Sequence, residues 1–238
     1  AAAGSGLAEA SAVTGTTPDS AGVTAGAIAD TRVEPYNVVP TLDESVAVVC
    51  VEAVAANMGL VPPVPGFLEG LRAECDRVGA LLLFDEVITG FRLGVDGATG
   101  WSGVTPDVWC FGKIIGGGLP VGAFGAAAEI MSSIAPLGPV YQAGTLSGNP
   151  LATAAGLAVL SQLDQGAYDR LIAIADALAQ GLEAAFADAG VAAAVPRVGP
   201  LVGCLFGDAS TFGGERPVDF SSAGASVALG RYPAFFHG

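Results

Sequence analysis

One amine in the chain stands where it could do covalent chemistry. Lys113 is the only lysine, because all the other basic residues are arginines. It follows the apolar run 108–111 and is followed shortly by three consecutive glycines, 116–118. An amine at a strand end, beside a backbone without side chains, can be partly desolvated and come close to a ligand. Such a lysine can form a Schiff base with a carbonyl cofactor; an ordinary strand-to-loop turn is the alternative.

A carboxylate, Asp85, lies 28 positions before this lysine. It ends the apolar run 81–84, which is typical of a strand buried on both faces in a parallel sheet. Ligands of open α/β sheets bind at the carboxyl ends of strands, where both residues are expected. A carboxylate near a Schiff-base lysine favours pyridoxal 5'-phosphate, whose ring nitrogen must stay protonated. The alternative is a carboxylate that caps the loop or helix beyond the strand.

Several stretches around these two residues resemble the class III branch of the pyridoxal-phosphate-dependent aminotransferases. Within that class, the sequence is similar to the glutamate-1-semialdehyde 2,1-aminomutase family. The resemblance runs from about residue 4 to residue 206, and the stretches that carry it are 56–59, 85–92, 103–107, 112–123 and 139–152. It implies fold type I, an α/β fold with a mainly parallel central sheet flanked by helices and part of a small C-terminal α+β domain.

The resemblance implies an isomerase of tetrapyrrole biosynthesis that converts glutamate-1-semialdehyde to 5-aminolevulinate by exchanging an amino group between adjacent carbons. Lys113 then holds the cofactor and shuttles protons, while Asp85 keeps the pyridine ring protonated. An ordinary class III ω-aminotransferase is the alternative, which the wording of residues 144–150 disfavours. A non-catalytic chain is the third interpretation, because two cofactor-binding elements of the family are missing; alone, this polypeptide is expected to be inactive.

The resemblance also assigns roles to residues away from the lysine. Asn57 is expected near the phenolic oxygen of the cofactor and Val87 in contact with the cofactor. Glu52 and Ser5 are expected near the substrate, a small amino aldehyde. The family has proline after the glutamate, whereas this chain has Ala53, for which a slightly looser loop is expected.

A glycine-broken polar loop, 141–150, opens a predicted helix. Its backbone N–H groups and hydroxyls suit a phosphate at a helix N-terminus. The resemblance implies that Gly144 and Thr145 reach the cofactor phosphate of the other subunit, so that a homodimer shares its active sites. N-capping of the helix by Ser147 or Asn149 explains the same loop more simply.

The composition indicates a globular α/β protein of 238 residues, of which 52% are hydrophobic and 13% charged. A net charge of −14 argues against nucleic acid and anionic membranes as partners. No apolar run approaches the roughly 18 residues of a membrane span, and no secretory signal opens the sequence. Four scattered cysteines without metal spacing indicate buried free thiols. The protein is therefore expected in the cytoplasm.

Two domains are expected, with a boundary at about residue 165. Residues 1–165 are predicted as a pyridoxal-phosphate-binding large domain, incomplete at its N-terminus. Residues 166–238 are predicted as a linking helix and a partial C-terminal small domain. The sequence lacks a start methionine and ends without an obvious stop, so it is interpreted as an internal fragment.

Hydrophobic patterns predict the individual elements. Strands are expected at 46–51, 81–84, 108–111, 121–125 and 201–206, and helices at 66–78, 126–133, 151–163 and 166–190. Residues 1–34 are expected to form a loop, and those after 207 a loop with at most a terminal helix. The charges of the first helix are interpreted as a solvated face, Arg92 as a member of an ion pair, and Trp101 as a packing residue.

Overall fold

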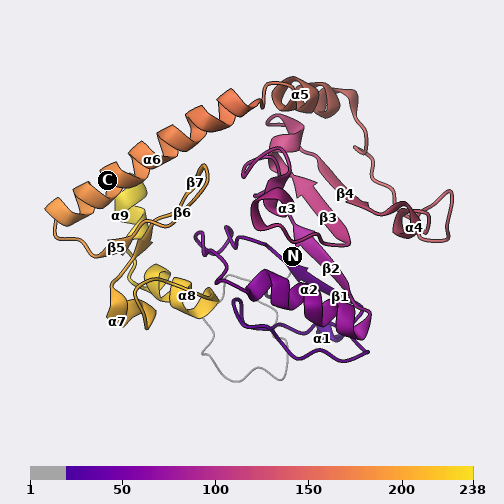
Figure 1. The fold of residues 1–238 in the computed structure, drawn as a ribbon, viewed down its shortest axis with the longest axis horizontal. Helices are drawn as coiled ribbons and strands as arrows, with labels where there is room; N and C mark the ends of the chain where they lie inside the picture. The colour runs from indigo at the N-terminus through magenta and orange to yellow at the C-terminus, as the bar shows by residue number, and fades with distance from the viewer. Residues whose placement is uncertain (1–19, 238) are drawn as a thin grey trace.

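The computed structural model describes residues 20–237, and a four-stranded sheet lies at its centre (Figure 1). Its order is β1-β2-β3-β4, in which the first three strands are parallel and the fourth is antiparallel. The strands are β1 (Val48–Val51), β2 (Leu81–Asp85), β3 (Val108–Gly112) and β4 (Gly122–Ala126). The predicted α/β fold with a mainly parallel sheet is confirmed.

Helix α2 (Phe67–Val78) connects β1 to β2 and covers one face of the sheet. Its apolar stripe, which includes Phe67 and Leu71, is buried against Leu82 and Phe84 of β2, whose side chains are fully buried. Each such side chain contributes about 1.5–3 kcal/mol by leaving water. The helix stops at Gly79, whose left-handed backbone (φ +76°) lets its N–H bond the carbonyl of Cys75. The predicted helix at 66–78 is therefore confirmed.

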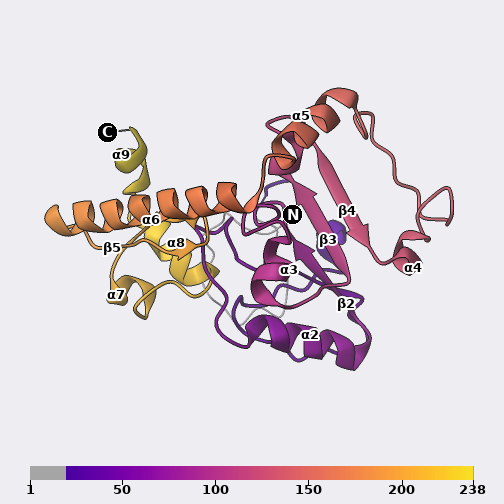
Figure 2. The same ribbon diagram turned by 45° about the horizontal axis from the view of Figure 1, so that its top comes forward.

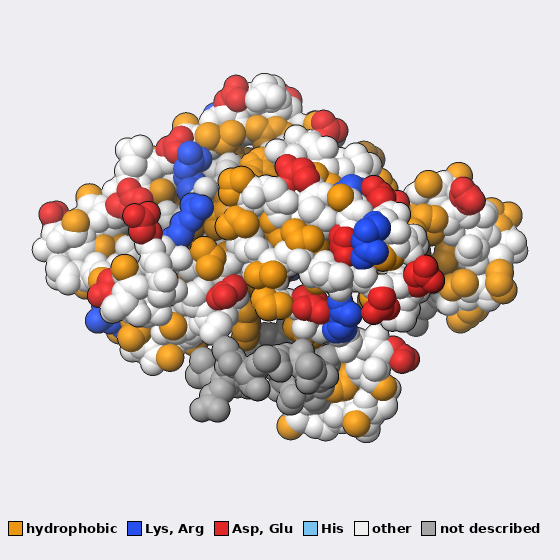
Figure 3. Space-filling model, turned by 60° about the horizontal axis from the view of Figure 1, so that its bottom comes forward, with side chains coloured by type: hydrophobic (Ala, Val, Ile, Leu, Met, Phe, Trp, Pro, Cys, Tyr) orange, Lys and Arg blue, Asp and Glu red, His pale blue; other side chains and the backbone are white. Residues whose placement is uncertain are grey.

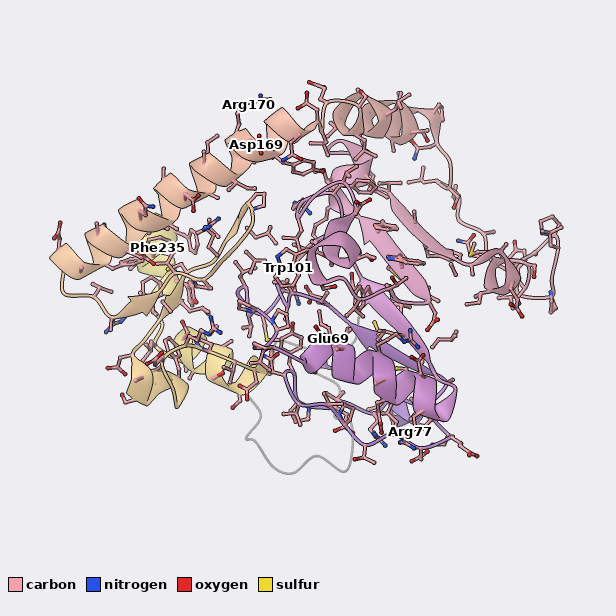
Figure 4. The ribbon with its side chains drawn as sticks, in the orientation of Figure 1. Glu69, Arg77, Trp101, Asp169, Arg170 and Phe235 are labelled. Atoms are coloured by element: carbon pink, nitrogen blue, oxygen red, sulfur yellow. The ribbon has the colours of Figure 1, made fainter. Side chains whose placement is uncertain are left out.

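The charged face of α2 is more than a solvated surface. Glu69 is exposed and Arg77 lies at the far end of the helix (Figure 4). Arg72, however, pairs with Asp107 at 2.8 Å, and that carboxylate also accepts the N–H of Leu82 at 2.7 Å. The interpretation of Arg72 as purely solvated was wrong, because its guanidinium bridges the helix to the start of β3.

The other face of the sheet carries the alternate side chains of each strand. On it lie the exposed Cys50 and Phe124 and the partly buried Leu83 and Asp85. All four cysteines are free. The expectation of buried thiols holds for Cys75 but was wrong for Cys50, because successive strand residues point to opposite faces.

Beyond β4 the chain forms an arm, residues 127–149, that projects away from the sheet (Figures 1 and 2). It contains α4 (Ala128–Met131) and exposes hydrophobic side chains, including Leu137 and Val140. Figure 3 shows hydrophobic side chains on the surface of this projecting lobe. The arm returns the chain to α5 (Pro150–Leu160).

Helix α5 packs directly on the 3-10 turn η1 (Lys113–Gly116) that follows β3. A Cβ atom at Gly156 would overlap the carbonyl oxygen of Ile115, and one at Gly117 would overlap that of Ala155. Only glycine allows two backbones to approach so closely. The turn that carries Lys113 is therefore held from outside by backbone contact.

Helix α6 (Gln165–Asp188) leads to the C-terminal elements, which lie along its length (Figures 1 and 2). The predicted strand 201–206 was wrong in being continuous, because Gly203 turns back to bond the carbonyl of Pro196. Its two halves join different partners, β7 with β6 and β8 with β5. These strands are β5 (Ala193–Ala194), β6 (Arg197–Val198), β7 (Leu201–Val202) and β8 (Leu205–Phe206).

Three helices lie in stretches predicted as loop: α1 (Ala25–Ile28), α7 (Ala209–Phe212) and α8 (Phe220–Ala228). Helix α3 (Gly97–Ser102) was not predicted, whereas the terminal helix is present as α9 (Tyr232–His237). Asp208 and Asp219 open α7 and α8 with capping boxes. The spacing Asp-x-x-Thr/Ser was the available signal. None of the helices in residues 20–237 is long and apolar enough to cross a membrane.

The C-terminal elements share a hydrophobic core with the loop that follows β1. Ala55 and Val61 of that loop are buried together with Leu205, Phe212 and Ala223. At the other end of this part of the chain, an aromatic cluster that includes Phe186, Phe206 and Phe235 joins α6, β8 and α9 (Figure 4). The C-terminal part is thus packed both on α6 and on the edge of the sheet.

Candidate active site

Three reactive side chains lie at the carboxyl ends of adjacent parallel strands. Glu52 follows β1, Asp85 ends β2 and Lys113 follows β3. Because parallel neighbours end at the same edge of a sheet, the fold brings these three residues together. We call them the strand-end cluster. Glu52 and Asp85 are partly buried, whereas Lys113 is exposed, so the expected partial desolvation of the lysine was wrong for this structure.

The pKa of Glu52 responds to the charges of both Asp85 and Lys113. Burial raises the pKa of Glu52, and hydrogen bonds from the N–H groups of Asn57 and Ala56 counteract that increase. The charge of Asp85 raises the pKa further, while the Lys113 ammonium lowers it. The charges of Asp85 and Lys113 therefore reach Glu52 across the ends of three strands.

Asp85 is oriented by its own turn. Its Oδ1 accepts the N–H of Val87 at 3.0 Å, and no residue among 20–237 donates a hydrogen bond to its Oδ2. Across the sheet it is paired in register with Cys110. Burial and the charge of Asp85 both raise the pKa of the Cys110 thiol. The carboxylate thus has one oxygen fixed by the protein and one open to a further donor.

Lys113 has an unusual backbone. Its φ is +48°, in the left-handed region that non-glycine residues rarely adopt. Such a conformation costs about 1–2 kcal/mol for a residue with a Cβ atom. The fold imposes it because β3 ends at the buried Gly112 and the chain must enter the η1 turn at once.

The loop after β1 is anchored. The Oε2 atom of Glu52 accepts the N–H of Ala56 at 3.1 Å and that of Asn57 at 3.3 Å. Ala53 is fully buried, and its carbonyl accepts the hydroxyl of Tyr36 at 3.1 Å. The loop is therefore fixed at the position where a looser one was expected. Asn57 itself is exposed beside Glu52.

Gly144 and Thr145 lie elsewhere, on the exposed loop 141–148 of the arm. Within residues 20–237 no hydrogen bond or ion pair joins this loop to the strand-end cluster. Asn149 caps α5 by accepting the N–H of Ala152 at 2.9 Å, so capping explains Asn149, though not Ser147. Ser5 lies outside the described residues.

Two expectations about single residues near the site were wrong. Arg92 forms no ion pair within the described chain; its Nη1 donates to the carbonyl of Ile88 at 2.7 Å. Burial lowers the pKa of this arginine. Trp101, near the end of α3, is 42% exposed (Figure 4), whereas Trp109 is partly buried and donates its Nε1–H to Thr99.

Glu86 has a structural role that was not predicted from the sequence. This side chain is 2% exposed, and its Oε2 accepts the N–H of Ala98 at 2.8 Å and the hydroxyl of Thr89 at 3.2 Å. Burial raises the pKa of Glu86. The Asp-Glu pair gave the signal, because consecutive residues leave a strand on opposite sides. Asp85 thus lies in the strand-end cluster, and Glu86 holds the start of α3.

A cavity of about 460 Å³ lies beside α3, on the helix-covered side of the sheet. Aromatic side chains, including Phe91, Trp109 and Phe111, line it. Because Trp109 and Phe111 alternate with Cys110 along β3, the cavity opens on the opposite face from the Asp85 side chain. It is therefore distinct from the strand-end cluster.

The chain is similar in sequence to proteins of known function. The family profile described as aminotransferase class-III matches residues 16–230. A glutamate-1-semialdehyde 2,1-aminomutase from Pelotomaculum thermopropionicum is 52% identical over 227 residues, and one from Anaeromyxobacter sp. (strain K) is 47% identical. Each alignment covers 92% of this chain and 51% of the relative. The chain thus spans about half the length of these curated relatives.

Solved structures give the same picture. An omega-transaminase from Sphaerobacter thermophilus superposes with a TM-score of 0.77 at 33% identity, covering 88% of this chain and 48% of its own. A glutamate-1-semialdehyde aminomutase variant from Pseudomonas aeruginosa PAO1, in complex with PMP, superposes with a TM-score of 0.73 at 29% identity. That alignment covers 88% of this chain and 49% of the relative.

Proposed function

The chain belongs to the class-III aminotransferase family, and we propose its function on that basis. We infer that it carries the pyridoxal phosphate site of a glutamate-1-semialdehyde 2,1-aminomutase, which converts that amino aldehyde to 5-aminolevulinate. The observation that carries the proposal is the convergence of Glu52, Asp85 and Lys113 at one edge of the sheet. The identity of 47–52% to proteins named for this activity supports the choice of reaction.

The residues fit the cofactor by their chemistry. The one lysine of the chain presents an exposed amine at a strand end, and Asp85 has an oxygen to which none of residues 20–237 donates. An amine and a carboxylate on neighbouring strands match the aldehyde and the ring nitrogen of pyridoxal phosphate. When bound, this cofactor supplies an aldehyde that condenses with amines and a ring that withdraws electrons from the adjacent carbon.

Each residue of the cluster has a proposed task. Lys113 holds the cofactor and, once its Nζ is free, accepts and returns a proton at the substrate carbon. Asp85 keeps the ring nitrogen protonated by accepting its hydrogen bond. Asn57 and Val87 complete the cofactor contacts. Glu52, whose pKa is raised by burial, faces the substrate and can keep its proton to a higher pH than a free glutamate.

A homodimer with shared sites is the second part of the proposal. Gly144 and Thr145 are exposed on the arm, together with the hydrophobic side chains of Leu137, Tyr141 and Leu146. A projecting segment with exposed hydrophobic side chains is typical of a surface that contacts another chain. We propose that this loop reaches the cofactor phosphate of the partner subunit.

We further propose two domains, with the boundary at about residue 165, where α6 begins. In this division the C-terminal part begins with the linking helix and completes one side of the substrate site. We place the protein in the cytoplasm, as a small-molecule enzyme.

A class III ω-aminotransferase is the second candidate. The observation in its favour is the TM-score of 0.77 with the S. thermophilus omega-transaminase, against 0.73 with the aminomutase. The higher sequence identity to aminomutases favours the first candidate. Because this polypeptide alone is expected to be inactive, the test uses a full-length protein that carries it. Formation of 5-aminolevulinate without any added 2-oxo acid supports the aminomutase, whereas a strict requirement for a 2-oxo acid acceptor supports the ω-aminotransferase.

The test of the cofactor site is chemical trapping. The purified chain is incubated with pyridoxal phosphate, reduced with borohydride, digested and analysed by mass spectrometry. We expect the label on the peptide that contains Lys113, its loss in Lys113→Arg and its weakening in Asp85→Ala. A label confined to the N-terminal amine, or no label, contradicts the proposed site.

A further inference from the structure

Arg92 donates hydrogen bonds to backbone carbonyls and not, as expected, to a carboxylate. It is half-buried, and its Nη1 donates to the carbonyl oxygens of Ile88 at 2.7 Å and Val87 at 3.5 Å. No acidic side chain of residues 20–237 pairs with it. A guanidinium that gives up water for peptide carbonyls loses hydration without gaining an opposite charge. The gain must therefore lie in fixing the backbone that it binds.

That backbone belongs to Val87, which is held from three sides. Its N–H donates to Oδ1 of Asp85 at 3.0 Å, and its carbonyl accepts from Arg92. Its side chain lies against Gly112, where an added Cβ atom would be 3.3 Å from Cγ1 of Val87. Gly112 immediately precedes Lys113. One residue thus touches both the carboxylate and the backbone that leads to the amine.

The rest of the turn is also restrained. Phe91 has a left-handed backbone (φ +56°), and its carbonyl accepts the hydroxyl of the buried Tyr168 at 3.1 Å. Its ring lies 5.8 Å from that of Phe111, centroid to centroid, next to Gly112. The turn from Asp85 to Arg92 is therefore anchored at both ends and packs on β3.

We propose that Arg92 is a positioning residue that sets the relative placement of Asp85 and Lys113 through the backbone of Val87. The role in cofactor binding rests on the proposed function, while the clamp itself is a property of the apo chain. Arg92 touches neither cofactor nor substrate in this proposal. It acts by keeping the Val87 N–H aimed at the carboxylate and the Val87 side chain against Gly112.

The direct test is amide hydrogen exchange of Val87 in the apo chain. We expect Arg92→Gln to accelerate exchange at Val87 by about tenfold, as one charged hydrogen bond to the turn is lost. Arg92→Lys retains a cationic donor and should restore part of the protection. Arg77→Gln is the matched control, since Arg77 also donates to a peptide carbonyl, that of Leu42, far from the turn. Circular dichroism confirms that each variant is folded.

The outcomes separate this inference from the proposed function. Unchanged exchange at Val87 in a folded Arg92→Gln chain overturns the clamp, whatever the cofactor does. Absence of cofactor at Lys113 in the wild-type chain contradicts the proposed function, and Val87 exchange still decides the clamp. When the cofactor binds, the pH profile of its absorbance should differ from that of the wild-type chain in Arg92→Gln and not in Arg77→Gln. An unshifted profile overturns the link from Arg92 to the cofactor ring.

Discussion

Two regions predicted to hold the same cofactor are built in opposite ways. The strand-end cluster sits on the sheet, with Asp85 bonded to its own turn and Glu52 bonded to two backbone N–H groups. The loop 141–148 of the arm is exposed along its whole length, and its hydrogen bonds are local. The first region is held in place by hydrogen bonds within one chain, whereas the second makes no long-range hydrogen bond to the rest of residues 20–237.

The difference separates two ways of building a site. Side chains that transfer or hold a proton benefit from a rigid support, because a small displacement of a catalytic group reduces the rate of the reaction. A loop that binds an anion through backbone N–H groups can be ordered when its partner arrives. The rigid region should therefore respond to changes in packing, and the arm to changes in chain concentration.

The largest expected effect is a loss of stability where two backbones pack closely. Gly156→Ala places a Cβ atom on the carbonyl of Ile115 and should lower the free energy of unfolding by about 3 kcal/mol, even after the helix-propensity gain of alanine. Gly144→Ala, on the arm, meets only the flexible Ser147 hydroxyl and should change stability by less than about 0.5 kcal/mol. Urea unfolding measures both, and equal effects would remove the contrast between the regions.

The next effect concerns the arm. Thr145→Ala should weaken pyridoxal phosphate binding by about 10–100-fold, since a hydrogen bond to a charged group is worth about 1.5–3 kcal/mol. Thr145→Ser keeps the hydroxyl and should bind nearly as well as the wild-type chain. Titration at several chain concentrations, followed by absorbance, should show binding that falls on dilution. Binding that is independent of both Thr145 and dilution would place the phosphate within one chain.

A smaller effect should reveal strain at the lysine. Because residue 113 has φ +48°, the free energy of unfolding of Lys113→Gly should be about 1 kcal/mol higher than that of Lys113→Ala. Thr145, which is outside the left-handed region, should show no such advantage for glycine over alanine. Thermal and urea unfolding of the four variants give the comparison. If glycine brings no gain at 113, the rigid region stores no strain there.

The smallest effect is a pH dependence at Glu52. Its folded-state pKa is raised above its ordinary value of 4.5, so the folded chain binds this proton more tightly than the unfolded chain. The contribution of Glu52 to stability is therefore full below pH 4.5 and falls as the pH rises through the folded-state pKa. Glu52→Gln should not lose stability in this way as the pH rises, and its amide oxygen still accepts the N–H of Ala56. Parallel pH profiles of unfolding for the two chains would contradict the shift.

The core of the fold could be predicted because local pattern and tertiary burial agree there. Leu81–Asp85 is apolar up to its last residue, and α2 shows its buried stripe in the sequence. The same agreement placed Asp85 and Lys113 at neighbouring strand ends. Their assigned roles, and those of Asn57, Val87, Gly144 and Thr145, remain predictions, because the contacts that define them involve molecules beyond this chain.

Other features could not be predicted because long-range contacts decide them. The run 201–206 has strand character throughout, but Gly203 must turn beside Gly59, where any Cβ atom would meet a backbone oxygen. Arg92 carries a charge that suggested a carboxylate partner, yet its position in a tight turn directs it to carbonyls of its own segment. In α3, glycines weaken the helical signal, and the distant Glu86 supplies the cap.

The shared core between the loop after β1 and the C-terminal elements limits how this protein can be recombined. Leu205 rests on Gly59, whose added Cβ would lie 2.8 Å from its Cδ2, and Asn37 bonds the carbonyl of Val218. A chimaera that exchanges everything after α5 for a relative's sequence would cut through this interface. Successful crossovers should therefore transfer residues 37–64 together with the C-terminal elements, as one heritable block.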